Sequence, residues 1–158
     1  MEERCLVGDG QRRALACLWQ CLGRVSEFSF TASNGPGSAT DWHGHGRGQV
    51  VAETAASQLL FEESAHFTHS DGRRVKMQNR YRWTLLQDSL KLEHLRRAVP
   101  VLLFELAPVT AHGFRQVTPH HCGRDTYTAE LLLHRPDIEL IWQIQGPHKN
   151  ERLHYHYW

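Results

Sequence analysis

Alternating polar and apolar residues run through most of the chain after about residue 25. The clearest case is the segment 75–85, where one set of alternate positions is largely apolar and the other is polar: Val75, Met77, Asn79, Tyr81, Trp83 and Leu85 against Lys76, Gln78, Arg80, Arg82 and Thr84. A period of two residues is typical of a strand with one buried face. The segment is therefore predicted to be a strand whose odd-numbered residues face a core.

The same pattern predicts further strands, about nine in all. The other eight segments are 25–32, 42–53, 59–67, 90–94, 101–106, 127–133, 138–144 and 153–157. Turn-forming residues separate many of them, such as Ser70, Asp71 and Gly72 before the 75–85 strand. Short, evenly spaced strands with little helix predict an all-β fold, and a single antiparallel barrel is favoured because closure leaves no strand edge unpaired.

One helix is predicted before the strands, from about Gln11 to Leu22. Its apolar residues recur at helical spacing: Ala14, Leu15, Leu18, Trp19 and Leu22. Asp9 is the expected N-cap and Gly23 the expected end of the helix. No linker or internal repeat interrupts the chain, so residues 1–158 are predicted to form one domain with an N-terminal helical segment at 1–23.

The composition gives little reason to expect a macromolecular partner. The net charge of the 158 residues is +1, which favours neither nucleic acid nor a membrane surface. No apolar run approaches the roughly 20 residues of a membrane-spanning helix, and Met1–Gly10 has acids where a signal peptide has bases. The cysteines at positions 5, 17, 21 and 122 match no zinc or disulfide spacing. We therefore expect a cytoplasmic monomer or homodimer with reduced thiols and a small molecule as its partner.

Several polar side chains fall on the face that alternation assigns to the interior. They are Glu63, Asn79, Tyr81, His94, Tyr127 and Tyr155. A buried carboxylate without a partner costs several kcal/mol, so Glu63 is expected to be paired, protonated or beside a wet cavity. The set fits either a structural hydrogen-bond network or the few convergent polar groups of a ligand pocket, with Trp142 as part of its apolar wall.

Two short motifs are expected at an end of the barrel. His121-Cys-Gly-Arg-Asp125 precedes the 127–133 strand, and Asp125 either orients His121 or Arg124 toward a ligand or caps local backbone amides. Gly146-Pro-His-Lys149 forms a turn in which Lys149 is a candidate contact for an anionic group.

Histidine is unusually frequent, with 12 in the chain. His43 with His45, and His154 with His156, alternate, so each pair shares one face of a strand. Both pairs lie opposite the inferred inner face, where a solvated exterior is expected. A register slip of one residue would turn them inward and favour haem or metal.

The glycine-rich segment after residue 41 resembles the first barrel strand of the calycins. Trp42, Gly44, Gly46 and Gly48 alternate there, and positions without side chains allow another group to approach closely. The spacing is also similar to that of the nitrobindins, haem-binding barrels, a resemblance that implies a histidine ligand near the C-terminus.

Over roughly residues 20–158 the chain resembles an uncharacterised bacterial lipocalin-like family, domain of unknown function 6314. The motifs that carry this resemblance are Phe61-Glu-Glu63, Tyr81-Arg-Trp83, His120-His-Cys-Gly-Arg-Asp-Thr-Tyr127, and Trp142 followed by Gly146-Pro-His-Lys149. The resemblance implies a lipocalin-like barrel and brings no established activity.

Three hypotheses for function follow, in this order. The first is a barrel that binds a small apolar or amphipathic molecule, with these candidate ligand residues: Asn79, Tyr81, His121, Asp125, Tyr127, Trp142, Lys149 and Tyr155. The second is an enzyme of isomerase, cyclase or hydrolase type with Glu63 and His94 as its acid–base pair. The third is a haem barrel that uses His154 or His156. Apart from haem under this third hypothesis, no cofactor is expected. A non-catalytic interaction module ranks last.

Overall fold

The computed structural model describes residues 8–96 and 99–158, in which one helix precedes eleven strands. The helix is α1 (Asp9–Leu22). The strands are β1 (Glu27–Asn34), β2 (Gly44–Ala55), β3 (Gln58–His69), β4 (Arg74–Leu85), β5 (Leu90–Arg96), β6 (Val99–Pro108), β7 (Gly113–Gln116), β8 (His120–Cys122), β9 (Asp125–His134), β10 (Asp137–Gln145) and β11 (Asn150–Tyr157). All nine strand segments predicted from alternation are strands in the structure.

Antiparallel pairing closes these strands into a barrel. The order around the described sheet is β10-β11-β1-β2-β3-β4-β5-β6-β7-β9, and β9 pairs again with β10 to complete the ring. The eleventh strand, β8, forms an antiparallel hairpin with β9 and is not part of the ring. The fold is thus an all-β closed barrel of ten strands with one N-terminal helix.

The prediction of about nine strands missed β7 and β8. Each has four residues or fewer, which is too short to show a period of two. β7 nevertheless completes the ring, because it pairs with β6 on one side and β9 on the other. Its buried Phe114 gives the only inward apolar position that a sequence pattern could have detected there.

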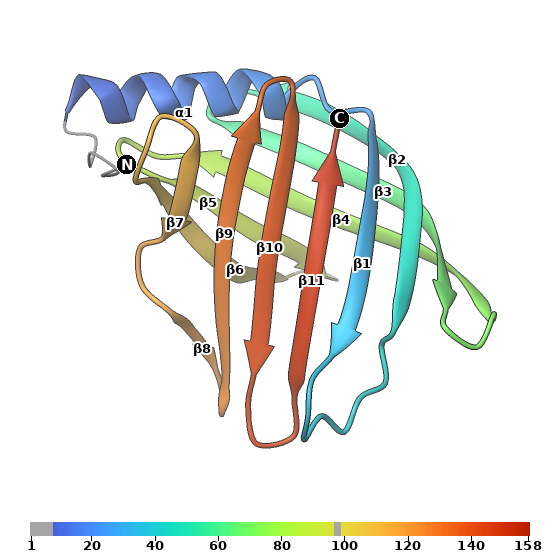
Figure 1. Cartoon of the computed structure of the whole chain (residues 1–158). Coiled ribbons are helices and arrows are strands. Elements are labelled where there is room, and N and C mark those ends of the chain that lie inside the picture. Colours follow the sequence, from blue (N-terminus) through green and yellow to red (C-terminus); the bar gives the residue numbers. More distant parts are fainter. Residues whose placement is uncertain (1–7, 97–98) are drawn as a thin grey trace.

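The helix closes one end of the barrel. Leu15, Leu18 and Leu22 are buried, and α1 lies across the end at which the C-terminus is also found (Figure 1). Gly23 ends the helix as predicted, but Asp9 is not the N-cap: Gly8 occupies that position and Asp9 is the first helical residue. No helix in residues 8–96 and 99–158 is long and apolar enough to cross a membrane.

Hairpin turns alternate between the two barrel ends, so the end away from α1 is formed by the opposite set of loops. The segment 35–43, the β3–β4 turn and the β10–β11 turn lie there (Figure 1). Large side chains such as Trp83, Phe104 and Phe114 fill the interior near α1. The space inside the barrel is consequently at the other end.

Cys17 and Cys21 of α1 are free thiols. The prediction of reduced cysteines also covers Cys5 and Cys122. Cys5 lies outside the described residues, and the side chain of Cys122 is not described. The acidic N-terminal segment used for the signal-peptide prediction also lies largely outside them, at residues 1–7.

Candidate functional site

A cavity of about 380 Å³ opens at the end of the barrel away from α1. We call it the mouth cavity. Its walls include six apolar side chains from six strands: Phe30, Phe67, Met77, Leu103, Ile144 and Leu153. Six residues predicted from alternation to be inward polar or pocket residues also line it: Asn79, Tyr81, His94, Tyr127, Trp142 and Tyr155. An apolar cavity of this size with a few polar groups is typical of small-molecule sites.

The rim of the mouth cavity carries two arginines and one carboxylate, Glu151, so its net charge is positive. Arg96 and Arg152 both line it and are exposed, and no carboxylate in the described part of the chain pairs with either of them. Next to Arg96, His94 stacks on Tyr81 with ring centroids 4.9 Å apart. Burial, and then the nearby Arg96 charge, lower the pKa of His94. His94 is therefore a neutral group beside a cation at neutral pH.

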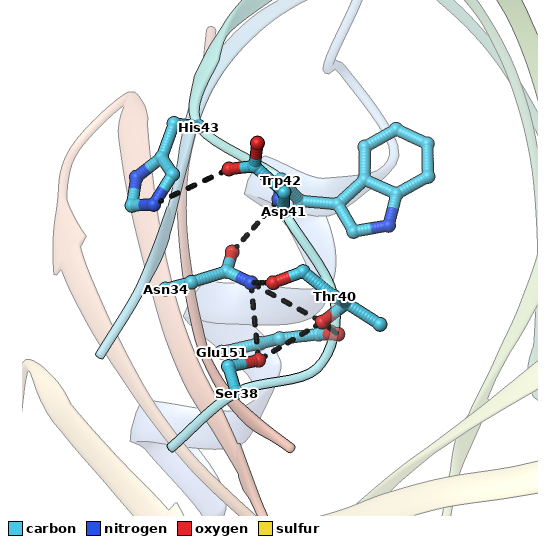
Figure 2. Close-up of polar contacts among 7 residues, drawn as sticks. All are labelled: Asn34, Ser38, Thr40, Asp41, Trp42, His43 and Glu151. Atoms are coloured by element: carbon cyan, nitrogen blue, oxygen red, sulfur yellow. Dashed lines mark hydrogen bonds and ion pairs between the residues drawn. The ribbon is translucent and has the colours of Figure 1, made fainter. Parts of the chain in front are cut away.

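A network of hydrogen bonds fixes the segment 35–43 beside the opening (Figure 2). The Asn34 side-chain amide donates to Ser38 and to the Thr40 carbonyl, and its Oδ1 accepts from the Trp42 backbone N–H at 3.0 Å. The Thr40 hydroxyl in turn donates to Glu151 at 2.5 Å. This network ties the segment to both β1 and β11.

The network also positions Trp42 at the rim. Its ring lies 5.6 Å from the Phe67 ring and 5.4 Å from the His69 ring, and it lines the mouth cavity while staying 42% exposed. A half-exposed aromatic side chain on a tethered loop is suited to cover part of a bound molecule.

Replacing Asn34 with Ala should loosen this segment locally, because one side chain supplies several of its hydrogen bonds. The expected loss is about 1–3 kcal/mol of local stability, seen as faster hydrogen exchange at the Trp42 amide. Asn34→Asp is the matched control, because it keeps the acceptor for Trp42 while removing the amide donor. Unchanged exchange at Trp42 in Asn34→Ala would show that the network does not hold the segment.

Glu63 lies in the interior and is 3% exposed. Tyr157 donates a hydrogen bond to its Oε2 at 2.8 Å, whereas Oε1 has no partner. Burial raises the pKa of Glu63 to about 8, although the hydrogen bond from Tyr157 acts in the opposite direction. The sequence predicted that Glu63 would be paired, protonated or beside a wet cavity. In the structure it is protonated at neutral pH, and one of its two oxygens has a hydrogen-bond partner.

Glu63 and His94 both face the interior but do not pair. Glu63 is bonded to Tyr157, His94 is stacked on Tyr81, and a further hydrogen bond joins the hydroxyls of Tyr81 and Tyr155. The acid–base role of Glu63 and His94 therefore stays a prediction that would need a substrate to bridge them.

The candidate ligand residues of the two end motifs do not line the mouth cavity. Asp125 does not orient His121 or Arg124: its carboxylate lies 3.7 Å from the Lys149 ammonium and packs against Gly146, where a Cβ would come within 2.0 Å of it. His121 is exposed and hydrogen-bonds Thr126, whose side chain alternates outward from Tyr127. The physical reason is register, because β9 brings Asp125 against the β10–β11 turn. Asp125 and Lys149 brace the barrel end, and neither they nor His121 line the mouth cavity.

The paired histidines of the last strand lie on the outer surface. His154 and His156 pair with Glu139 at 3.1 Å and Asp137 at 2.7 Å, two carboxylates of the neighbouring β10. His45 faces the same outer surface. The prediction of an exterior position is therefore right for His45, His154 and His156. The inward histidine that the haem hypothesis requires is not supplied by His154 or His156.

Comparison with known proteins gives one match. Residues 29–158 match the family described as "Family of unknown function (DUF6314)". The chain belongs to this family. No curated protein and no solved structure matches it.

In this DUF6314 chain, sequence reasoning missed several residues of the mouth cavity: Met77 as a wall residue, and Trp42, Arg96, Glu151 and Arg152 at the rim. A sequence signal existed for three of them. Alternation in the 75–85 segment already places Met77 on the inward face. Extending the alternation two residues beyond His94 gives Arg96, and two residues before Leu153 gives Glu151. The role of Trp42 depends on the path of an irregular loop, which alternation does not describe.

Proposed function

We propose that this chain is a calycin-like barrel that binds one amphipathic small molecule in the mouth cavity. The observation that carries the proposal is a half-enclosed space of about 380 Å³ inside a barrel that α1 closes at its other end. A barrel evolved only for stability would fill this space with its own side chains, because packed interiors leave few voids larger than water.

The chemistry of the lining indicates what the cavity would hold. The aromatic and aliphatic wall favours an apolar body, while Asn79, His94 and Arg96 offer hydrogen bonds and positive charge near the opening. Trp42 is placed to cover the exposed side of the occupant. The proposed ligand therefore has an apolar body and a polar or anionic end.

Filling the cavity tests the proposal. Met77→Trp places a large ring on the inner face of β4, whereas Gln78→Trp places the same ring on the outer face one residue away. The probe is the dye 1-anilinonaphthalene-8-sulfonate, which combines an apolar body with an anionic group. We expect saturable binding at one site in the unmodified protein and in Gln78→Trp, and at least tenfold weaker binding in Met77→Trp.

Circular dichroism and thermal melts should first establish that both variants are folded. Native mass spectrometry of the unmodified protein supplies the stoichiometry. Dye binding that is unsaturable, or equal in the two tryptophan variants, would contradict the proposal.

A further inference from the structure

A second, much smaller space lies deeper in the barrel than the mouth cavity. We call it the inner cavity; its volume is about 10 Å³, room for a single oxygen-sized group. Glu63, Trp83 and Trp142 line it together with several aromatic and leucine side chains. Tyr81, Trp142 and Tyr155 line both cavities, so the two spaces adjoin.

The inner cavity gathers unpaired polar atoms. Four buried side-chain N or O atoms in the described residues lack a hydrogen-bond partner, and three of them belong to its lining: Glu63 Oε1, Trp83 Nε1 and Trp142 Nε1. The fourth, Thr84 Oγ1, lies elsewhere. Buried polar groups are nearly always satisfied in folded proteins, so three residues with an unpaired polar atom in the lining of one small space indicate a site for a polar group.

All three atoms are hydrogen-bond donors. Each indole Nε1–H can only donate. Tyr157 already donates to Glu63 Oε2, so the proton of the neutral acid belongs on Oε1 and makes that oxygen a donor as well. Three donors without an acceptor call for an oxygen atom with free lone pairs.

Protonation of Glu63 is consistent with everything that faces it. The titratable groups that interact with it are Tyr81, Tyr155 and Tyr157, each a neutral phenol whose pKa is raised by burial. No cation among the described residues stabilises a carboxylate at this position, and burial raises the pKa of Glu63.

Glu63 also lies at the right depth to meet a molecule entering from the mouth. Its Cα is the cross-strand partner of Asn79, a wall residue of the mouth cavity. Trp142 contributes to both cavities. A molecule in the mouth cavity can thus direct its inner end toward these donors.

We propose that Glu63, Trp83 and Trp142 form a three-donor subsite that binds a neutral oxygen acceptor, a carbonyl or hydroxyl, at the inner end of the ligand. The inference rests on the proposed function, because it names the chemistry of the ligand's buried end. It assigns the acid of Glu63 as a donor and not as the counter-ion of an amine.

A matched pair of probes tests the subsite: 2-octanone and 2-methyl-1-octene, in which a methylene group replaces the carbonyl oxygen. Affinities are measured by displacement of bound 1-anilinonaphthalene-8-sulfonate. Trp142→Phe and Glu63→Leu each remove one donor, and each should weaken 2-octanone about 5- to 10-fold more than it weakens the alkene. Glu63→Gln is the rescue variant, because its amide N–H₂ replaces the acid donor and its carbonyl still accepts from Tyr157; it should bind 2-octanone like the unmodified protein.

Infrared spectra of 2-octanone labelled with ¹³C at its carbonyl report hydrogen bonding to the carbonyl oxygen directly. The frequency of the carbonyl stretch would not change in the variants if these side chains only stabilised the fold. The carbonyl stretch should lie at low frequency in the unmodified protein and in Glu63→Gln, and shift upward in Trp142→Phe and Glu63→Leu. This measurement remains decisive if a variant is destabilised but still binds at low temperature.

The contrary outcomes are distinct. If octylammonium binds better than 2-octanone and Glu63→Gln abolishes that binding, the site is a carboxylate for cations and the donor subsite is wrong. If both neutral probes bind but no variant separates them, the subsite is wrong, for instance because the inner cavity holds only an ordered water, and the ligand-binding barrel stands. If neither probe nor dye binds, the proposed function fails as well.

Discussion

The free energy of unfolding should fall by several kcal/mol as the pH rises from about 5 to 8, and Glu63→Gln should remove that fall. The pKa of Glu63 is about 8 in the folded protein, against an ordinary value of 4.5. Below pH 4.5 both folded and unfolded states hold the proton, so the stabilising difference is fully present. Between 4.5 and 8 only the folded state holds it, and stability falls by about 1.4 kcal/mol per pH unit.

The size of this effect follows from the interval between the two pKa values. About 3.5 pH units separate them, which corresponds to a loss on the order of 5 kcal/mol. Above pH 8 both states have released the proton and the dependence on this residue ends. A loss of this size is a large fraction of the roughly 5–15 kcal/mol by which a whole domain is stable.

Urea denaturation of both proteins at each pH from 5 to 9 measures the difference directly. His94 acts with the opposite sign, because burial lowers its pKa and its contribution grows as pH rises through its titration. It is present in both proteins, so subtracting Glu63→Gln from the unmodified protein cancels it. Parallel curves would show that Glu63 ionises normally and would also remove one of the three proposed donors.

Much of the barrel is predictable from this sequence because most strands are long enough to show alternation. In β4, for example, Met77, Asn79, Tyr81 and Trp83 face inward in the structure as the period of two predicts. The failures are strands too short for that signal. Four residues in β7 complete the ring, yet they contain a single large apolar residue, Phe114, and one residue cannot show an alternation.

The candidate site was predictable in part for the same reason. Alternation gives the facing of Asn79, Tyr81 and His94, but not their depth along the barrel or the end that opens. Those depend on where α1 packs, which is a long-range property. The pairing of Asp125 with Lys149 likewise depends on how β9 meets a turn some twenty residues later.

The hydrogen bonds between polar side chains in the interior could not be predicted from the sequence either. The bond between Tyr157 and Glu63 joins residues 94 positions apart, and it determines which carboxyl oxygen is left free. The three donors come together only in the folded barrel. The sequence alone identified Glu63 as a buried carboxylate, but not its neighbours.

The second large effect concerns the wall of the mouth cavity, where Gly46 makes room for Phe30. A Cβ at Gly46 would lie 2.2 Å from the nearest atom of the Phe30 ring, which also stacks on Phe67 and Tyr155 at 5.6 and 5.1 Å. The ring is buried and held on several sides, so it cannot move away freely. Gly46→Ala should therefore destabilise the barrel by about 2–3 kcal/mol through overpacking.

A double-mutant cycle with Phe30→Ala tests this cause. Phe30→Ala alone should cost about 3–5 kcal/mol, and in that background the methyl of Gly46→Ala enters vacated space, so the double variant should be about 1–3 kcal/mol more stable than the sum predicts. Gly23→Ala is the control, because its Cβ would have an ordinary contact of 3.5 Å. Additive losses, or a Gly46→Ala protein as stable as Gly23→Ala, would show that the glycine is not there to admit the ring. A positive coupling would show that the glycine alternation of β2 shapes the cavity wall, because Phe30 is one of the side chains a ligand would touch.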